Sequence, residues 1–560
     1  MTGDPPQLTP SGHADPFTRR HALAVRPWPD LVYSMPELRY PQRFNAATVL
    51  LDGTGARLGH DRRAVVTDSA IWTYADLLGR VHQIAHVLHH DLHVVPGNRV
   101  LLTGSNSPWF IACLLAVLEA GAVAVPLPPM LRTHELNSMI NAVEPSAALC
   151  DSGNLHTMTG TGLPALGYGT GETDDLYRRA ARHPTHCPRV DLAGDDVALI
   201  LFSSGTTGNP KPSMHFHRDL LAVGDTVGRH LLRLRPDDLV ACNRSMALTY
   251  GLGGLVLSPL RFGSAALLPE DTGPESLFEA IARHRADLVL TTPSGYRAAV
   301  PASETLRTLR RCVSGGERLD ESLWRTWHDR TGRKIIDIMG ATELTNGVLG
   351  ATEDRIRPGS TGLPIPGYQV QVIDADGHPC PVGHIGQLAV RGPTGCRYLA
   401  HPRQATAIHD GWTLTGDLCR RDHDGYFWMR GRTDDAISID GYNVVPAEVE
   451  AVLLSHPTVI DAAVVGYTKP SGNAALAAYV VLATDTVATH AITDLTNLLT
   501  DRLSAYEHPS AVLILPSLPR TTTGKTDRAE LRRRAEQPDS TSDRPAPADL
   551  YVHDTSCELG

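Results

Sequence analysis

The chain has 560 residues, more than one hydrophobic core usually holds, so we expect two or more domains. Apolar residues make up 42% and charged residues 20%, as in ordinary globular proteins, and the net charge of −10 argues against a nucleic-acid partner. The longest apolar run, residues 110–127, is interrupted by Glu119, Gly121 and Pro126 and is too broken to span a bilayer. The nine scattered cysteines form no CxxC pair, so we expect reduced thiols and a cytoplasmic location. The interrupted apolar run predicts no membrane partner.

Residues 1–40 are punctuated by prolines and predict an irregular N-terminal arm. From residue 45 onward, short apolar runs typical of buried strands alternate with stretches of helical spacing. The predicted helix covers 74–88, and the predicted strands cover 100–102, 147–150, 197–200, 287–290 and 335–338. This alternation is typical of an α/β fold with parallel strands and helices on both faces.

The pattern of predicted helices and strands changes at about residue 365. Short strands and turns, including 369–373 and 387–391, then indicate a β-rich subdomain. Helices at 448–454 and 491–503, with strands at 462–465 and 477–482, predict a compact α+β unit. The predicted domains are an irregular arm (1–40), a large domain (41–433), a small mobile C-terminal domain (434–536) and a disordered tail (537–560).

The most informative stretch is LFSSGTTGNPK at residues 201–211. Its glycines allow backbone N–H groups to face an anion. Its hydroxyls are hydrogen-bond donors and Lys211 adds a positive point charge, so we expect a phosphate group as the ligand. A proline before the lysine excludes a Walker A loop, and the structural alternative is a polar turn between strands. The chain has only four lysines, which favours a functional role for Lys211 and Lys525. The candidate phosphate-binding residues are Ser203, Ser204, Gly205, Thr206, Thr207, Gly208 and Lys211.

Two carboxylates stand where a nucleotide could be held. Glu343 ends the segment DIMGATE after the predicted strand 335–338, and open α/β sheets bind ligands at strand ends. A carboxylate there could coordinate Mg²⁺ together with nucleotide phosphates; the alternative is an acid near a helix start. Asp417 follows a strand-like run and could accept both hydroxyls of a ribose; the alternative is a turn aspartate.

Five motifs in this order resemble the adenylate-forming superfamily, which includes acyl-CoA ligases, luciferases and stand-alone adenylation enzymes. They are 201–211 (with Pro212 where many members have glycine), DIMGATE at 337–343, TGD at 415–417, GRTDD at 431–435 and PRTTTGK at 519–525. The resemblance implies ATP and Mg²⁺ as cofactors, Glu343 and Thr206 as metal ligands, and Lys525 as the catalytic lysine between substrate carboxylate and α-phosphate. It places Arg432 on the ribose and phosphate and Asp434 at the domain hinge. The other nucleotide-binding residues that it implies are Gly316, Glu317, Met339, Gly340, Ala341, Thr342 and Asp417.

Four further segments look like aryl-CoA ligases, especially the 2-aminobenzoate- and benzoate-CoA ligases. They are MPELRYP at 35–41, MHFHRD at 214–219, YGLGG at 250–254 and GPTGCRYL at 392–399. The resemblance implies an acid pocket made by Tyr250, Gly251, Ser314, Gly315 and Asn346; an ordinary core aromatic is the less favoured alternative for Tyr250. Asn346 stands where these ligases usually have a bulkier apolar stretch and could hydrogen-bond a ring substituent, which favours a hydroxy- or aminobenzoate.

The acceptor of the aryl group is CoA by default. The resemblance places Gly441 in the pantetheine tunnel, but Asp440 beside it disfavours a polyanionic thiol unless its side chain faces solvent. A carrier-protein thiol, or a small-molecule hydroxyl or amine acting in trans, is the alternative acceptor. The competing class is a non-catalytic nucleotide-binding homologue, against which the joint presence of Glu343, Asp417, Arg432 and Lys525 argues.

Overall fold

The computed structural model divides into two compact units. Unit 1 comprises residues 1–379, 388–415 and 421–428, and unit 2 comprises 380–387, 416–420 and 429–560. The last boundary, at 428/429, lies five residues before the predicted one at 433/434. The structure describes residues 7–129, 131, 133–169, 175–203, 210–300, 306, 308–433, 437–439, 442–469, 474–483, 486–504, 507–521 and 526–536.

Unit 1 contains a six-stranded sheet in the order β6-β5-β3-β4-β7-β8. All neighbouring strands are parallel except the last pair, β7 and β8, which is antiparallel. The strands are β3 (Arg99–Thr103), β4 (Val123–Leu127), β5 (Ala147–Asp151), β6 (Ala165–Tyr168), β7 (Val197–Ser203) and β8 (Lys211–Phe216). The central strands β3 and β4 are buried along their whole length, as parallel strands covered on both faces are.

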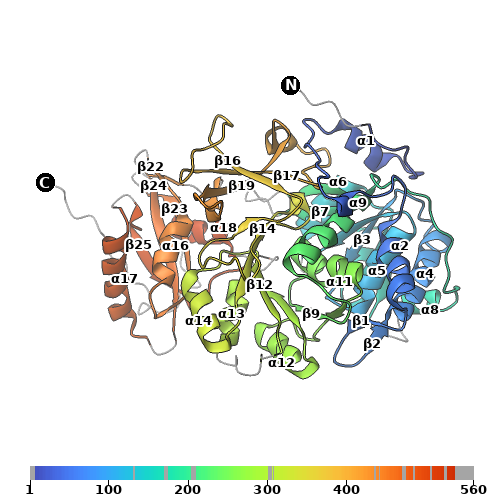
Figure 1. Ribbon diagram of the computed structural model, residues 1–560, viewed down its shortest axis with the longest axis horizontal. Helices are drawn as coiled ribbons and strands as arrows, with labels where there is room; N and C mark the ends of the chain where they lie inside the picture. The colour runs from blue at the N-terminus through green and yellow to red at the C-terminus, as the bar shows by residue number, and fades with distance from the viewer. Residues whose placement is uncertain are drawn as a thin grey trace. The chain divides into compact units, whose positions relative to one another are not determined.

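Helices pack against this sheet because their apolar residues recur at helical spacing. α4 (Tyr74–His90) begins at a capping box, in which Thr73 Oγ1 accepts from Asp76 N at 3.1 Å and Thr73 N donates to Asp76 at 2.9 Å. α4 packs on α5 (Pro108–Glu119), which in turn contacts β3 and β4 (Figure 1). The other helical segments before β7 are α2 (Ala46–Leu50), α3 (Asp52–Leu58), α6 (Thr133–Val143), η2 (Ser152–Asn154), α7 (Leu155–Thr159) and α8 (Asp175–Ala180).

A second, nine-stranded sheet of unit 1 has the order β15-β14-β13-β12-β11-β9-β10-β1-β2. Its central strands are parallel, and antiparallel strands close both edges. The strands are β1 (Arg63–Val66), β2 (Ile71–Thr73), β9 (Leu239–Cys242), β10 (Ala265–Leu267), β11 (Leu288–Thr291), β12 (Arg311–Gly315), β13 (Ile335–Gly340), β14 (Gly347–Gly350) and β15 (Leu363–Pro364). The helical segments are α9 (His217–Val223), η4 (Gly224–Leu231), α10 (Thr249–Leu252), η5 (Gly253–Leu257), α11 (Ser258–Phe262), α12 (Pro274–His284), α13 (Pro293–Ala299), α14 (Glu321–Thr331) and η7 (Thr342–Leu344). The predicted α/β fold is therefore confirmed.

The β-rich region expected after residue 365 is also present. Its strands run in the order β16-β17-β19-β18, and β20 pairs with β19. They are β16 (Gln369–Ile373), β17 (Ile385–Arg391), β18 (Ile408–His409), β19 (Trp412–Arg421) and β20 (Phe427–Arg432), with the short helix α15 (Gln404–Ala407). Two of them, β16 and β17, cover the strands predicted at 369–373 and 387–391.

The C-terminal part of unit 2 is an α+β unit, as the pattern predicted. β23 and β24 form an antiparallel pair, and β25 joins β24 in parallel. Apolar residues of α16 and α17, among them Val449, Leu453 and Leu495, share one core with these strands. The elements are β21 (Ile437–Ile439), β22 (Tyr442–Val444), α16 (Pro446–Leu454), β23 (Val459–Thr468), β24 (Ala474–Leu482), α17 (Ala488–Arg502), β25 (Ala511–Ile514) and α18 (Arg528–Glu536).

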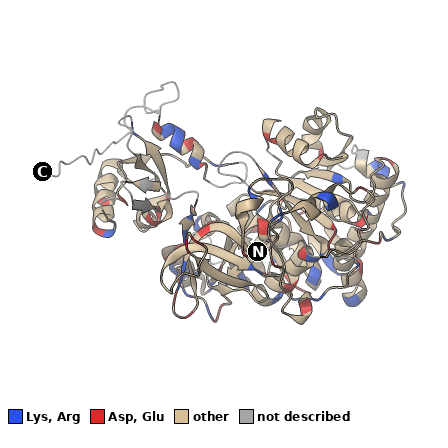
Figure 2. Cartoon of the chain, turned by 90° about the horizontal axis from the view of Figure 1, so that it is seen from above, with Lys and Arg blue, Asp and Glu red and all other residues tan. Residues whose placement is uncertain are grey.

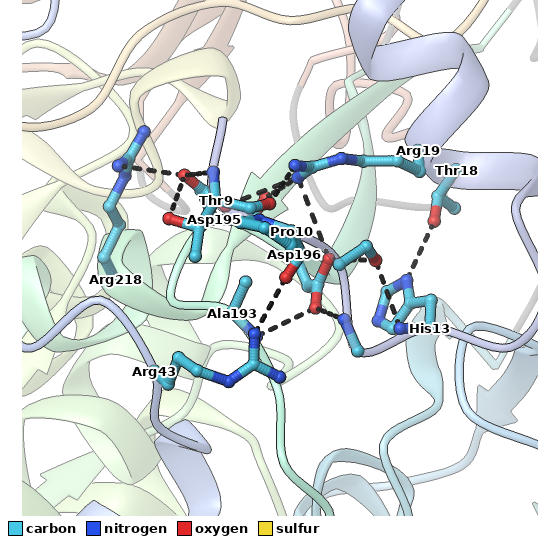
Figure 3. Close-up of polar contacts among 12 residues, drawn as sticks. Thr9, Pro10, His13, Thr18, Arg19, Arg43, Ala193, Asp195, Asp196 and Arg218 are labelled. Atoms are coloured by element: carbon cyan, nitrogen blue, oxygen red, sulfur yellow. Dashed lines mark hydrogen bonds and ion pairs between the residues drawn. The ribbon is translucent and has the colours of Figure 1, made fainter. Parts of the chain in front are cut away.

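The N-terminal arm was expected to be irregular, but it contains a helix, α1 (Phe17–Ala24), and the short η1 (Pro36–Leu38). Two buried aspartates that immediately precede β7 hold it (Figure 3). Asp195 accepts from Thr9 N at 3.1 Å and lies 3.3 Å from Arg19 Nη1, and Asp196 accepts from Gly12 N at 2.8 Å. We call these contacts the N-terminal clasp. Long-range ion pairing, which local composition does not reveal, orders the arm.

The charge distribution, the cysteines and the hydropathy of the helices can also be compared with the expectations from sequence. Figure 2 shows acidic and basic residues interspersed over the described part of the chain. The eight described cysteines are all free thiols, as expected. Within the described residues, the longest apolar helices fall short of what a membrane span requires.

Candidate active site

The predicted phosphate loop joins the antiparallel strands β7 and β8. Ser203 ends β7, Lys211 begins β8, and the two residues are paired in the register of the hairpin. The Ser203 hydroxyl is buried and interacts with the side chain of Tyr398. A hydroxyl at the start of this loop can also act as a hydrogen-bond donor to an anionic ligand. The loop residues Ser204, Gly205, Thr206, Thr207 and Gly208 lie outside the described residues.

Glu343 lies in the single turn η7, directly after β13, and β7 and β8 both contact this turn. The hydroxyl of Tyr398 donates to Glu343 Oε1 at 2.5 Å. Burial first, and then the negative charge of Glu343, raise the pKa of Tyr398, so the phenol stays protonated and remains a donor. Tyr398 is itself held by a backbone bridge to Ser213 of β8. The phosphate-loop hairpin, Tyr398 and the predicted metal carboxylate therefore form one cluster.

The chain turns sharply between Glu343 and Asn346. Thr345 adopts a left-handed conformation with φ of 70°, which is strained for a β-branched residue. Its side chain is buried, and its hydroxyl lies 2.9 Å from Nδ1 of His215 in β8. Burial lowers the pKa of His215 to about 3, so the imidazole is neutral. Such strain persists only where the surroundings hold it, and it is common at ligand sites.

Tyr250 and Gly315 form one wall of the predicted acid pocket. The Tyr250 hydroxyl donates to the Val313 carbonyl at 3.1 Å, and its ring covers Gly315 so closely that a Cβ there would lie 3.0 Å from the ring. Gly315 must therefore lack a side chain for this tyrosine to keep its place. The neighbouring Ser314 hydroxyl is buried without a hydrogen-bond partner among the described residues. Gly251 instead packs on backbone, since a Cβ there would lie 2.2 Å from the Ser245 carbonyl.

Asn346 is 7% exposed and is enclosed by two glycines. A Cβ on Gly253 would lie 2.1 Å from Asn346 Nδ2, and a Cβ on Gly340 would lie 2.3 Å from the Asn346 carbonyl oxygen. Both glycines thus create the space that Asn346 fills at the start of the β14 hairpin. Asn346 and Glu343 are three positions apart in the sequence, and the left-handed Thr345 turns the chain between them.

The predicted ribose-binding residues lie together in unit 2. Arg432 Nη1 is 3.3 Å from Asp417 Oδ1, and Gly416, with φ of +78°, gives the guanidinium room. Thr433 closes the turn by donating to the Gly416 carbonyl at 3.0 Å. An aspartate with an adjacent guanidinium offers both an acceptor for hydroxyls and a donor for phosphate.

The other predicted nucleotide-binding residues occupy strand ends. Gly316 follows β12 with φ of +86° and open space around it, so the backbone can approach a ligand, and the half-buried Glu317 comes next. Met339, Ala341 and Thr342 are half-buried at the end of β13 and the start of η7. Asp434, Asp440, Gly441 and Lys525 lie outside the described residues.

Sequence reasoning assigned no role to the pair Arg397 and Asp219. Both side chains are fully buried, they form an ion pair, and the Arg397 guanidinium lies 4.1 Å from the Phe216 ring centroid. Burial raises the pKa of Asp219, while the Arg397 charge opposes that shift. The pair fixes the 392–399 segment beside β8, and so it positions Tyr398. The segments 214–219 and 392–399 had been noted, but only their juxtaposition reveals this function.

The phosphate-loop hairpin and the carboxylate turn of unit 1, and separately the aspartate–arginine pair of unit 2, each offer the groups that the sequence predicts for nucleotide binding. The model for the AMP-binding enzyme family matches residues 53–398, and the model for its C-terminal domain matches 448–525. The chain therefore belongs to the AMP-binding enzyme family, and the predicted ATP/AMP-binding function is confirmed.

Within this family, the chain is similar to proteins that act on aromatic acids. It is 31% identical to the benzoate–CoA ligase of Thauera aromatica over 89% of this chain and 97% of that protein. It is 32% identical to the p-hydroxybenzoic acid–AMP ligase of Mycobacterium marinum over 78% of this chain and 62% of that protein. The crystal structure of an anthranilate CoA ligase in complex with anthranoyl-AMP superposes with a TM-score of 0.84 at 27% identity, covering 90% of this chain and 99% of that one.

Proposed function

We propose that the protein activates an aromatic carboxylic acid of the hydroxy- or aminobenzoate type to an aryl-AMP, releases pyrophosphate, and transfers the aryl group to CoA. The observation that carries the proposal is the left-handed turn at Thr345, which lies between Glu343, the residue that we assign to the nucleotide's metal, and Asn346, the residue that we assign to the acid. The similarity to benzoate–CoA ligase and to the anthranoyl-AMP complex supports an aromatic acid.

In the first step, an oxygen of the acid carboxylate attacks the α-phosphorus of ATP and the bond to the bridging oxygen of pyrophosphate breaks. Ser203 and Lys211 bind phosphate oxygens, and Tyr250 with Asn346 orients the acid. Lys525 stabilises the charge that develops between carboxylate and α-phosphate. Asp417 and Arg432 hold the ribose.

Glu343 fits a magnesium ion, because its half-exposed carboxylate is an oxygen ligand that Tyr398 holds in one orientation. Glu343 and Thr206 would hold the ion, which neutralises phosphate charge when bound. Tyr398 fixes the carboxylate and stays protonated while it does so.

In the second step, the small domain (434–536) turns about Asp434, which removes Lys525 and admits the acceptor along Gly441. The thiol sulfur of CoA attacks the acyl carbon, the bond to AMP breaks and the thiol proton is lost. Transfer to a carrier-protein thiol or to a small-molecule hydroxyl or amine is the second candidate. The similarity to a p-hydroxybenzoic acid–AMP ligase and the position of Asp440 favour that alternative.

Mass spectrometry of products tests both steps. The purified protein is incubated with ATP, Mg²⁺ and a panel of benzoate, hydroxybenzoates and aminobenzoates, with and without CoA. An aryl-CoA product supports the proposal, and aryl-AMP that accumulates despite CoA supports the alternative acceptor. Absence of both products with every acid overturns the aromatic assignment.

Pyrophosphate exchange tests the catalytic lysine separately. Lys525→Ala is expected to abolish exchange, whereas Lys469→Ala, another of the four lysines, is expected to leave it intact. Unchanged exchange in Lys525→Ala contradicts the role assigned to that lysine.

A further inference from the structure

Asn106 lies in the loop between β3 and α5, at the C-terminal end of a central strand of the six-stranded sheet. Its half-buried side-chain amide makes two hydrogen bonds to one distant segment. Nδ2 donates to the Arg244 carbonyl at 2.9 Å, and Oδ1 accepts from Met246 N at 2.9 Å. A carbonyl can only accept and a backbone N–H can only donate, so these two partners fix the orientation of the amide. We call this pair of hydrogen bonds the Asn106 clamp.

The segment that the clamp holds, residues 243–248, joins β9 of the nine-stranded sheet to α10. A second amide holds the start of the same segment, because Asn243 Oδ1 accepts from Thr291 Oγ1 at 2.9 Å, at the end of β11. The Asn106 clamp thus links strand ends of two separate sheets, across 138 and 140 positions of sequence.

The clamped segment supports the wall of the proposed acid pocket. α10 begins directly after it and carries Tyr250 and Gly251. Gly251 packs on the segment so closely that a Cβ there would lie 2.2 Å from the Ser245 carbonyl oxygen and 2.4 Å from that of Arg244. The Arg244 carbonyl therefore contacts both the Asn106 amide and α10. A shift of this carbonyl displaces α10, and with it the ring of Tyr250.

We propose that Asn106 is a positioning residue for the aromatic acid, because the clamp sets the place of α10 and so of the Tyr250 ring. This inference rests on the proposed function, which assigns Tyr250 to the acid pocket. None of the residues that we assign to ATP belongs to the segment 243–248, so we expect the clamp to affect the acid and not the nucleotide. The effect is large enough to measure, since a displacement of about 1 Å at a reacting group can cost about 100-fold in rate.

Asn98 offers a matched control, because it precedes β3 as Asn106 follows it. Its amide is also half-buried and also makes two hydrogen bonds. Oδ1 accepts from Val95 N at 3.1 Å, and Nδ2 donates to Asp15 Oδ2 at 2.9 Å. Asn98→Ala and Asn106→Ala therefore each lose two amide hydrogen bonds, at opposite ends of one strand, and Tm measurements report the loss of stability in each.

Steady-state kinetics and amide hydrogen exchange on the full-length protein test the proposal. We expect Asn106→Ala to raise the KM for the aromatic acid at least about tenfold and to change the KM for ATP less than about twofold. Asn98→Ala should change neither KM, even where its Tm falls as far. Without substrates, the segment 243–248 should exchange faster in Asn106→Ala only, because the Met246 amide has lost its acceptor.

The exchange and kinetic results separate the clamp from its role in acid binding. Equal exchange of residues 243–248 in the parent protein and in Asn106→Ala overturns the clamp. Faster exchange with an unchanged KM for the acid, or with an equal rise in the KM for ATP, overturns the positioning role. A parent protein that uses no aromatic acid overturns the proposed function and the acid-positioning role with it, whereas hydrogen exchange still reports on the clamp.

Discussion

The Tyr398 hydroxyl donates a 2.5 Å hydrogen bond to Glu343, across 55 residues of sequence. This bond fixes the carboxylate that we assign to magnesium. We expect Tyr398→Phe to raise the Mg²⁺ concentration needed for pyrophosphate exchange by about 10–100-fold, the usual effect of losing a residue that supports a metal ligand. Exchange measured over a range of Mg²⁺ concentrations gives this shift.

Tyr426→Phe is the matched control for that experiment. Its hydroxyl donates at 2.9 Å to the carbonyl of Arg355, which is not one of the residues that we assign to the site. Each variant loses one tyrosine hydrogen bond, worth about 1 kcal/mol to the Arg355 carbonyl and about 1.5–3 kcal/mol to the Glu343 carboxylate, but only Tyr398 touches Glu343. Equal Mg²⁺ dependence in the two variants contradicts the role of Tyr398.

Gly253→Ala tests the acid pocket. The new methyl group would lie 2.1 Å from Asn346 Nδ2, and the terminal amide will move because it is more easily displaced than backbone. We expect the KM for a hydroxy- or aminobenzoate to rise and its preference over benzoate to fall at least about tenfold, with the KM for ATP unchanged. Gly53→Ala is the control, because its Cβ would meet no atom closer than 3.6 Å. An unchanged preference would show that Asn346 does not contact the ring substituent in the acid pocket.

Acid should destabilise the protein through two buried histidines. Burial lowers the pKa of His215 and His217 to about 3, whereas an unfolded histidine titrates near 6.5. The unfolded chain therefore binds more protons below pH 6.5, and stability present above that pH is lost as pH falls toward 3. Each histidine contributes a slope of up to about 1.4 kcal/mol per pH unit.

Urea unfolding between pH 7.5 and 5 measures this slope. His217 Nδ1 accepts from Ala46 N at 3.2 Å, and His217→Asn keeps an acceptor there but cannot be protonated. This variant should lose a substantial part of the slope. His423→Asn, at an exposed position, should keep all of it, and a parallel loss in both variants would refute the assignment.

Asp337 should make the protein less stable as pH rises, which is the opposite of the effect of the two buried histidines. Burial raises the pKa of Asp337 to about 7, although Thr361 donates to it at 2.9 Å. The folded protein keeps this proton between about pH 4 and pH 7, where an unfolded aspartate has lost it, so the stabilisation is present at low pH and lost as pH rises through 7. The free energy of unfolding of Asp337→Asn, minus that of the parent protein, should therefore be larger at pH 8.5 than at pH 5. Equal differences at the two pH values in urea unfolding contradict this expectation.

Local pattern predicted the elements well, because burial and helical spacing leave a signal in neighbouring residues. The strand expected at 335–338 is the core of β13, and the helix expected at 74–88 is α4. Local pattern did not reveal the Tyr398–Glu343 bond or the Arg397–Asp219 ion pair, which join residues 55 and 178 positions apart. Nor did it show that β7 and β8 form an antiparallel hairpin, since register depends on the partner strand.

The N-terminal clasp also bears on how the chain is made. Thr9 and Asp195 are 186 positions apart, and translation at about 5–20 residues per second separates their synthesis by roughly 10–40 s. During that interval the clasp cannot form, because β7 does not yet exist, although Asp15 of the arm already has its ion-pair partner Arg99. Formation of the clasp thus coincides with synthesis of β7, the strand that leads into the phosphate loop.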